Sequence, residues 1–159
     1  MDKKFELIKE KEDDVYYRIR ALRDFGEVKT GDIGGYIEKD ENLSQYGNAW
    51  VYDDAKVYGN AKVCDDAKVY DDAKVYGNAK VCGNAKVCGN AKVCGNADYI
   101  VFKNWWSSGR YFTWTKSNDM WRVGCFYGTG AELIAKAYKD SELSGREYER
   151  IVKYVEGIK

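Results

Sequence analysis

The sequence predicts a mainly β protein in which short parallel strands wind into a coil over residues 37–97. The first observation is a six-residue repeat, A-K-V-(Y/C)-(G/D)-(N/D), which runs from Ala49 to Ala97 with Ile37 and Leu43 as degenerate earlier members. The second is its polarity: in a strand, the alanine and the valine point to one side, and the lysine and the tyrosine or cysteine to the other. The third is the Gly-Asn or Asp-Asp pair, which suits a sharp corner because these residues tolerate a left-handed backbone.

A unit of six residues cannot bury its apolar face alone, so the units must stack around a common interior of alanine and valine. In this the repeat resembles the hexapeptide-repeat left-handed parallel β-helix, in which three units form one triangular coil of about 18 residues. The resemblance implies a left-handed coil, although the general rule for parallel connections favours the right hand. It also implies a homo-oligomer, with a trimer favoured.

We expect three segments: an N-terminal β-hairpin cap over residues 1–36, the β-helix over 37–97, and a C-terminal α+β cap over 98–159. Caps are expected because an open coil leaves unpaired strand edges and an exposed core at both ends. In the first segment, KFELI and VYYRIRAL have strand character on either side of the charged turn 10–14, and GDIGGYI leads into the coil.

The C-terminal segment combines strands and helices. YIVF, RYFTWT and MWRVGCF have the composition of strands. Thr129 with Glu132, and Ser144 with Glu147, form S/T-x-x-E capping boxes. These boxes predict two helices of about 8 and 13 residues.

The segments on both sides of the repeat carry a second resemblance. YRIRALRDFG and GDIGGYIE before the repeat, and GCF followed by GT after it, are similar to bacteriophage and prophage proteins described as polymer-forming or hexapeptide-repeat proteins. The resemblance covers nearly the whole chain and implies a phage origin, and with it the cytoplasm of a bacterial host. It supplies no set of catalytic residues.

Charge and hydropathy exclude several classes of partner. Lysine plus arginine and aspartate plus glutamate both number 26, so the chain lacks the positive field of a general nucleic-acid or anionic-membrane binder. No stretch approaches the roughly 18 consecutive apolar residues of a membrane span, and the first residues lack the apolar region of a signal peptide. We therefore expect a cytoplasmic protein without membrane contact.

The absence of histidine argues against catalysis. The chain contains no histidine, the commonest general base and metal ligand. The acyltransferases and carbonic anhydrases built on the fold that the repeat resembles depend on histidine. We therefore expect no enzymatic activity and no cofactor, since a fold by itself carries no activity.

One corner of the coil brings four carboxylates together. Because positions 18 residues apart lie about 4.8 Å from one another, Asp53 and Asp54 stack on Asp71 and Asp72. Such a cluster could hold Ca²⁺ or Mg²⁺. We favour the alternative, in which aspartate serves as a corner residue beside neutralising lysines, and we expect no metal.

The five cysteines predict reduced thiols rather than a disulfide framework or a zinc site. Cys64 and Cys82 share one lane of the coil, while Cys88 and Cys94 fall on the other two, so the four do not converge on a centre. The distance between adjacent coils would allow a disulfide, but neighbours in register rarely have the required torsion. Structural packing is the expected role.

Outward tyrosines form two pairs at the 18-residue spacing. The members of these pairs, which are the candidate oligomer interface, are Tyr52, Tyr58, Tyr70 and Tyr76. An exposed aromatic lane suggests a cover, either a second subunit or the terminal segments folding back. Packing against the lysine stems of the coil is a further alternative.

The least repetitive chemistry lies in the mildly basic C-terminal segment. The candidate residues for ligand or partner binding are Trp105, Trp106, Arg110, Tyr111, Trp114 and Arg122. Aromatic faces can stack a nucleobase, and arginine forks suit phosphates or carboxylates. The same aromatic residues are also what a small core would contain.

We therefore expect a non-enzymatic phage protein that blocks a host protein, such as an effector of anti-phage defence, through protein–protein contacts. One alternative is an oligomeric sponge that sequesters a nucleotide immune signal. Another is a structural phage component.

Overall fold

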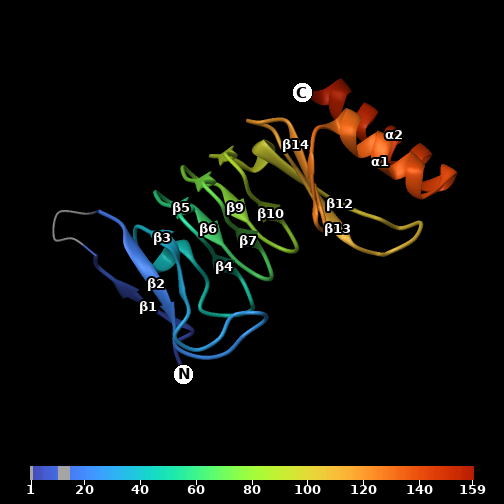
Figure 1. Ribbon diagram of the computed structural model, residues 1–159. Coiled ribbons are helices and arrows are strands. Elements are labelled where there is room, and N and C mark those ends of the chain that lie inside the picture. Colours follow the sequence, from blue (N-terminus) through green and yellow to red (C-terminus); the bar gives the residue numbers. More distant parts are fainter. Residues whose placement is uncertain (1, 11–14) are drawn as a thin grey trace.

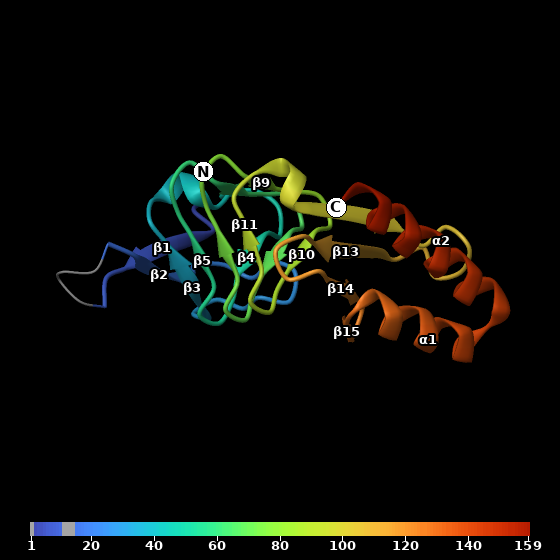
Figure 2. The same ribbon diagram turned by 90° about the horizontal axis from the view of Figure 1, so that it is seen from above.

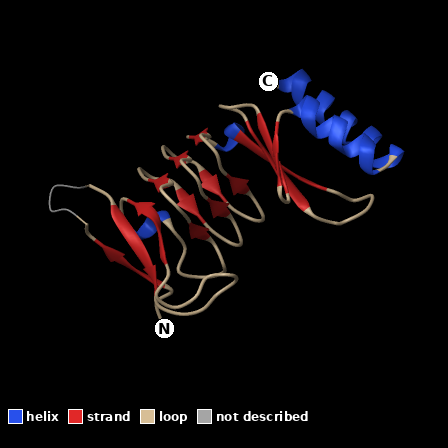
Figure 3. Cartoon of the chain, viewed as in Figure 1, coloured by secondary structure: helices blue, strands red, loops and turns tan. Residues whose placement is uncertain are grey.

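The structure is a computed structural model that describes residues 2–10 and 15–159. Its centre is a β-solenoid of about three turns, with strands of the N-terminal segment at one end and a sheet with two α-helices at the other (Figure 1). Strands and loops account for most of the chain, and the α-helices come last (Figure 3). The predicted mainly β solenoid is confirmed, whereas its left hand stays a prediction.

The solenoid is built from two-residue strands, one from each six-residue unit. In the described chain they are β4 (Trp50–Val51), β5 (Lys56–Val57), β6 (Lys62–Val63), β7 (Lys68–Val69), β8 (Lys74–Val75), β9 (Lys80–Val81), β10 (Lys86–Val87) and β11 (Lys92–Val93). Strands three units apart pair in parallel, so β5, β8 and β11 form one ladder, β4, β7 and β10 a second, and β6 and β9 a third. Each turn of the solenoid therefore contains three units, as the period predicts.

The interior of the solenoid consists of the alanine and valine of each unit. In the central turn, for example, Ala73 and Val75 both have an exposed fraction of 0%. The intervening lysines and the tyrosines or cysteines are more exposed and lie on the outside, apart from the buried Cys88. The predicted facing of the repeat is confirmed.

Aspartate at a corner has a structural task. Asp53, Asp65 and Asp71 adopt φ values of 55°, 60° and 60°, the left-handed region that glycine occupies at the other corners. The carboxylate of each accepts a hydrogen bond from the backbone N–H of the corner residue 18 positions later, at 3.0, 2.9 and 2.9 Å. Aspartate therefore links one turn to the next, which glycine cannot do.

The N-terminal strands extend one face of the solenoid. β1 (Phe5–Ile8) pairs antiparallel with β2 (Tyr17–Ala21), which pairs antiparallel with β3 (Ile33–Ile37), and β3 runs parallel to β5. The strands predicted in KFELI and VYYRIRAL are present, while residues 11–14 of the predicted turn lie outside the described residues. Phe5 and Ile19 have an exposed fraction of 0% and belong to the solenoid core.

A buried lysine closes the N-terminal end. Lys4 has an exposed fraction of 0%, and its Nζ donates a hydrogen bond to the carbonyl of Ala49 at 2.8 Å and longer ones to those of Tyr46 and Gly47. Burial, with a smaller contribution from the charge of Arg23, lowers the pKa of Lys4 to about 8. The ammonium supplies donors to carbonyls that have no further turn to pair with.

The C-terminal cap begins with a four-stranded antiparallel sheet. Its strands, in sheet order, are β12 (Tyr99–Lys103), β13 (Tyr111–Thr115), β14 (Met120–Val123) and β15 (Phe126–Gly128). The sequence MWRVGCF, predicted as one strand, forms two, because the chain reverses at Gly124, whose φ is 55°. Sheet and helices lie beyond the last turn of the solenoid (Figure 2).

Both predicted helices are present, but one starts elsewhere. The N-cap of α1 (Gly130–Asp140) is Thr129, whose hydroxyl accepts from the N–H of Glu132 in the predicted capping box. The N-cap of α2 (Glu142–Ile158) is Ser141, whose hydroxyl accepts from the N–H of Ser144. The predicted start at Ser144 is therefore wrong, because an earlier serine is already available as the N-cap.

The cap seals the last turn of the solenoid with side-chain acceptors. The backbone N–H groups of Lys80, Lys86 and Lys92 have no further turn above them. They donate instead to Asn96 Oδ1 at 3.1 Å, Thr113 Oγ1 at 2.9 Å and Ser117 Oγ at 2.7 Å. Each of the three faces therefore ends on at least one polar side chain of the cap.

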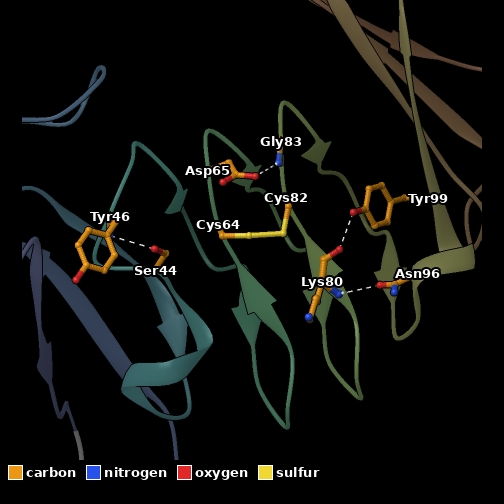
Figure 4. The surroundings of a disulfide bond; sticks show 9 residues. All are labelled: Ser44, Tyr46, Cys64, Asp65, Lys80, Cys82, Gly83, Asn96 and Tyr99. Carbon is orange, nitrogen blue, oxygen red and sulfur yellow. Dashed lines mark hydrogen bonds between the residues drawn. A yellow bond between two sulfur atoms is a disulfide. The ribbon is translucent and has the colours of Figure 1, made fainter.

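A disulfide joins two neighbouring turns. Cys64 and Cys82 are bonded, with their Cα atoms 4.7 Å apart (Figure 4). The prediction of reduced thiols is wrong for this pair, because stacking in register brings the Cα atoms within the range that a disulfide spans. Among the described residues, Cys88, Cys94 and Cys125 are free.

Candidate functional site

A groove runs along the junction between the solenoid and the cap. Two adjoining cavities, of about 400 and 370 Å³, lie between the β7–β10 face and the β14–β15 turn and share Lys68, Lys86 and Gly124. The first is also lined by Glu27, Tyr52, Asp53, Tyr70, Arg122 and Cys125, and the second by Asp66, Asn84, Arg110 and Tyr111. We call these two cavities together the junction groove.

Basic side chains converge on the junction groove from two elements. Lys68 and Lys86 stack on adjacent turns of one face, Arg110 comes from the loop between β12 and β13, and Arg122 comes from β14. Lys68 pairs with Glu27 at 3.6 Å. Within the described chain, the other three cations have no ion-pair partner. Because Asp53 and Asp66 also line the groove, its four cations face three carboxylates, and the lining carries a net charge of +1.

Arg122 is the most confined of these cations. Its guanidinium carbon lies 5.3 Å from the centroid of the Tyr70 ring, and that ring meets the ring of Tyr52 edge-on at 6.4 Å. Its Nε is buried and has no hydrogen-bond partner in the described structure. A buried donor without a partner costs about 1 to 3 kcal/mol, more when it is charged, so this atom needs an acceptor.

The ionisable groups of the junction groove respond to burial and to crowding. Burial, followed by the charges of Lys68 and Arg122, lowers the pKa of Lys86. Burial, together with the nearby Cys88, raises the pKa of Tyr70 far above its ordinary value. A bound anion would offset the mutual repulsion of the cations and raise the pKa of Lys86.

The structure brings half of the predicted cap residues together. Arg110, Tyr111 and Arg122 all line the junction groove. Tyr111 is 43% exposed, and the Nζ of Lys103 lies 5.9 Å from its ring centroid. Two cationic residues and one aromatic residue of the predicted set therefore share the junction groove, and their role in binding stays a prediction.

The three predicted tryptophans lie elsewhere in the cap. Trp114 is 2% exposed, and its Nε1 donates to Asp119 at 2.8 Å. Trp106 is partly buried, meets Tyr148 edge-on at 4.9 Å between ring centroids and packs against the cap core. Trp105 is 69% exposed and does not line the junction groove. Two of the three tryptophans, Trp106 and Trp114, therefore fit the alternative in which the aromatic residues of the cap form a small core.

Sequence analysis missed the contribution of the solenoid to the groove. Lys68 and Lys86 stand 18 positions apart, and this spacing places them in one lane. That signal was present in the repeat. What the repeat could not show is that the cap lies over this lane rather than over the equivalent lysines of the other two faces.

The tyrosine pairs are covered by parts of the same chain. Tyr58 and Tyr76 stack at 5.1 Å between ring centroids, and Tyr16 meets Tyr58 edge-on at 5.6 Å. Tyr70 is covered by Arg122. These contacts favour the alternative in which the terminal segments fold back, while the role of the tyrosines at an oligomer interface stays a prediction.

The aspartate corner has other partners. The carboxylates of Asp53 and Asp71 accept backbone N–H groups, and that of Asp54 pairs with Arg18 at 2.8 Å. Within the described residues, the one group with metal-ligand spacing contains Cys64, Asp65 and Cys82. Its two sulfurs form the disulfide, so it offers no set of free ligands.

Comparisons with known proteins supply no family for the chain. No protein-family model matches it, and no curated protein matches it at a significant level. In the part of the chain that the structure describes, neither helix has the length and apolar character that crossing a membrane requires. The functional argument therefore rests on the geometry of the junction groove.

Proposed function

We propose that the protein is a non-enzymatic binding protein that captures an anionic ligand of the nucleotide class in the junction groove. The observation that carries the proposal is the buried Nε of Arg122, which lacks an acceptor. Arg122 and Lys86 line the same cavity of the groove, and Arg110 lines the adjoining one. Phosphate oxygens are strong acceptors for guanidinium and ammonium groups. One phosphate in the groove would offset the crowded charge, and a shift of the guanidinium toward it would give Nε an acceptor.

Aromatic rings and size favour a nucleotide over a simple inorganic anion. Tyr52 lines one cavity of the groove and Tyr111 the other, and a tyrosine ring can stack against a base. Cavities of about 400 and 370 Å³ fall within the range of small-molecule sites. Capture needs no nucleophile or general base, which agrees with a chain that contains no histidine.

The proposal includes the biological setting that the sequence resemblance implies. A phage protein in the cytoplasm of a bacterial host would act by withdrawing a nucleotide signal from solution. We further propose a left-handed coil and a trimer, as the likeness to hexapeptide-repeat proteins implies, and a hairpin of β1 and β2, as the strand pattern of residues 1–36 predicts. Size-exclusion chromatography with light scattering tests the assembly directly.

Exposed aromatic residues favour a second candidate, contact with a host protein. Trp105 is 69% exposed on the loop after β12, and Tyr111 is 43% exposed at the start of β13. Tryptophan and tyrosine are enriched among the residues that dominate binding at protein interfaces. In this case Trp105→Ala would abolish a stoichiometric complex with the partner while ligand binding in the junction groove stays unchanged.

Two measurements test ligand capture. Mass spectrometry of a heat-denatured extract identifies any nucleotide that copurifies, and calorimetric titration with AMP, GMP, CMP and UMP measures affinity. Arg122→Gln should weaken binding about thirtyfold, the effect of losing about 2 kcal/mol at a hot spot.

The repeat supplies a matched control for the second cation. Lys86→Met should weaken binding, whereas Lys74→Met, at the same position of the unit on another face, should not. Equal effects of Lys86→Met and Lys74→Met, or no binding of any nucleotide by the unaltered protein, would contradict the proposal.

A further inference from the structure

A third cavity adjoins the junction groove inside the cap. Its volume is about 480 Å³, and it lies between the β14–β15 turn and the ends of α1 and α2 that meet at Ser141. Arg110 lines this cavity and one half of the junction groove, and Cys125 lines this cavity and the other half. The third cavity therefore adjoins the groove at these two residues.

The lining of the third cavity differs from that of the groove. Phe126 and Tyr148 supply aromatic surface, and the rim carries the hydroxyls of Ser107, Ser108 and Ser144. The hydroxyl of Ser108 accepts from the N–H of Arg110, and that of Ser144 accepts from Trp106 Nε1. A hydroxyl that accepts one bond keeps its own proton to donate, so these two serines can still donate to a ligand.

The two compartments thus offer complementary chemistry. The groove concentrates cations, while the third cavity combines aromatic walls with hydroxyl donors, which match the ring faces and polar edges of a nucleobase. Its one ammonium, Lys136, has a carboxylate partner, Asp140, at 3.4 Å. Arg110 stands where the two compartments meet, in reach of a phosphate that links their contents.

We infer that the ligand is a dinucleotide, with its phosphates in the junction groove, one base against the groove tyrosines and the other base in the third cavity. This inference rests on the proposed function and deepens it. A mononucleotide would fill only one compartment. A base that stacks in the second compartment adds enough binding to raise affinity at least about tenfold.

The test compares ligands of one and two units on the same protein. Calorimetric titrations use AMP, GMP, CMP and UMP against the linear dinucleotides pApA, pGpG, pCpC and pUpU. At least one dinucleotide should bind about tenfold or more tightly than its mononucleotide. Equal affinities within every pair would overturn the inference and leave mononucleotide capture standing.

A substitution that fills the third cavity separates the two compartments. Lys136 is an exposed residue of α1 that lines this cavity, so Lys136→Trp should reduce the affinity for the dinucleotide to that for the mononucleotide. Lys139→Trp, on the same helix and outside the lining, should change neither affinity. Arg122→Gln should weaken both ligands. Full dinucleotide affinity in Lys136→Trp would overturn the inference, whereas failure of every ligand to bind the unaltered protein would overturn the proposed function itself.

Discussion

The solenoid and the C-terminal cap are both well packed but are organised in opposite ways. In the solenoid, Val57, Val75 and Val93 are stacked copies with an exposed fraction of 0%, and each turn repeats the contacts of the one before. In the cap, Phe112 and Trp121 sit in a separate aromatic core where every contact occurs once. Repetition makes a fold easy to predict and its surface uniform. Distinctive chemistry arises where the irregular part lies against the regular one.

The two ends of the solenoid show a related contrast. At the N-terminal end, a cationic donor, Lys4, contacts carbonyl groups of the first turn. At the C-terminal end, neutral acceptors such as Thr113 and Ser117 contact N–H groups of the last turn. Each edge of a parallel stack presents both N–H and C=O groups, and at the C-terminal end the Tyr99 hydroxyl donates to the carbonyl of Lys80 at 2.6 Å. The two caps therefore satisfy main-chain groups with different side chains.

The largest expected effect comes from breaking the repeated core. Val75→Asp places a carboxylate among stacked valines and should lower the free energy of unfolding by more than about 3 kcal/mol. Lys74→Ala, one residue away on the outside, should cost less than about 1 kcal/mol. Urea denaturation followed by circular dichroism measures both changes. Similar losses would contradict the facing of the repeat.

Reduction of the disulfide should act on the solenoid alone. The bond between Cys64 and Cys82 closes a loop of 18 residues, and removing it should lower the free energy of unfolding by about 3 kcal/mol on the chain-entropy account. Urea titrations with and without dithiothreitol measure the difference. The double variant Cys64→Ser/Cys82→Ser should be insensitive to the reductant. Indifference of the unaltered protein to dithiothreitol would contradict a stabilising role.

The lysine at the N-terminal end predicts a pH dependence. Its folded pKa of about 8 lies below the ordinary value of 10.5, so between these pH values the unfolded chain binds more protons. Stability should therefore rise with pH across this window, by about 2 to 3 kcal/mol from this group. The comparison is between the unaltered protein and Lys4→Met, with the exposed Lys3→Met as control. The increase in stability with pH should disappear in Lys4→Met and persist in Lys3→Met. Parallel pH profiles of the unaltered protein and both variants would refute the role of Lys4.

The smallest effect concerns the acceptors at the opposite end. Thr113→Val keeps the shape of the side chain but removes the acceptor for the N–H of Lys86, and should cost about 1 to 2 kcal/mol. Hydrogen exchange of the Lys86 amide should accelerate at the same time. The control variant is Thr129→Val, at an exposed threonine that caps α1, and it should leave the Lys86 amide protected. Unchanged exchange at Lys86 in Thr113→Val would show that Thr113 does not seal the edge.

The sequence predicts the solenoid more accurately than the C-terminal cap. The period of six fixed the strands, the facing of Val75 and the corners, because every turn restates the same constraint. In the cap, by contrast, single residues decide: Gly124 splits one predicted strand into two, and Ser141 moves the start of a helix. The 18-residue spacing of Cys64 and Cys82 allowed a disulfide, but the expected cytoplasmic location favoured free thiols.

The sequence predicted the residues that the cap contributes to the junction groove, but not those that the solenoid contributes. Arg110 and Arg122 stood out among the aromatic residues of the cap. Lys68 and Lys86 did not, because they are indistinguishable from every other lysine of the repeat until the cap selects one face. Such a choice depends on the angle at which two units meet, which local sequence patterns do not encode.

The polar contacts that close the two ends of the solenoid affect how the repeat can change in length. Lys4 and Thr113 contact main-chain groups, which every turn presents alike, and neither depends on a particular side chain of the repeat. An in-frame duplication of eighteen codons would insert one more turn and leave both seals chemically intact. The same event would move Tyr52 about 4.8 Å further from Arg122 along the groove. Recombination between the near-identical repeats would therefore lengthen the solenoid face that lines the junction groove by one turn.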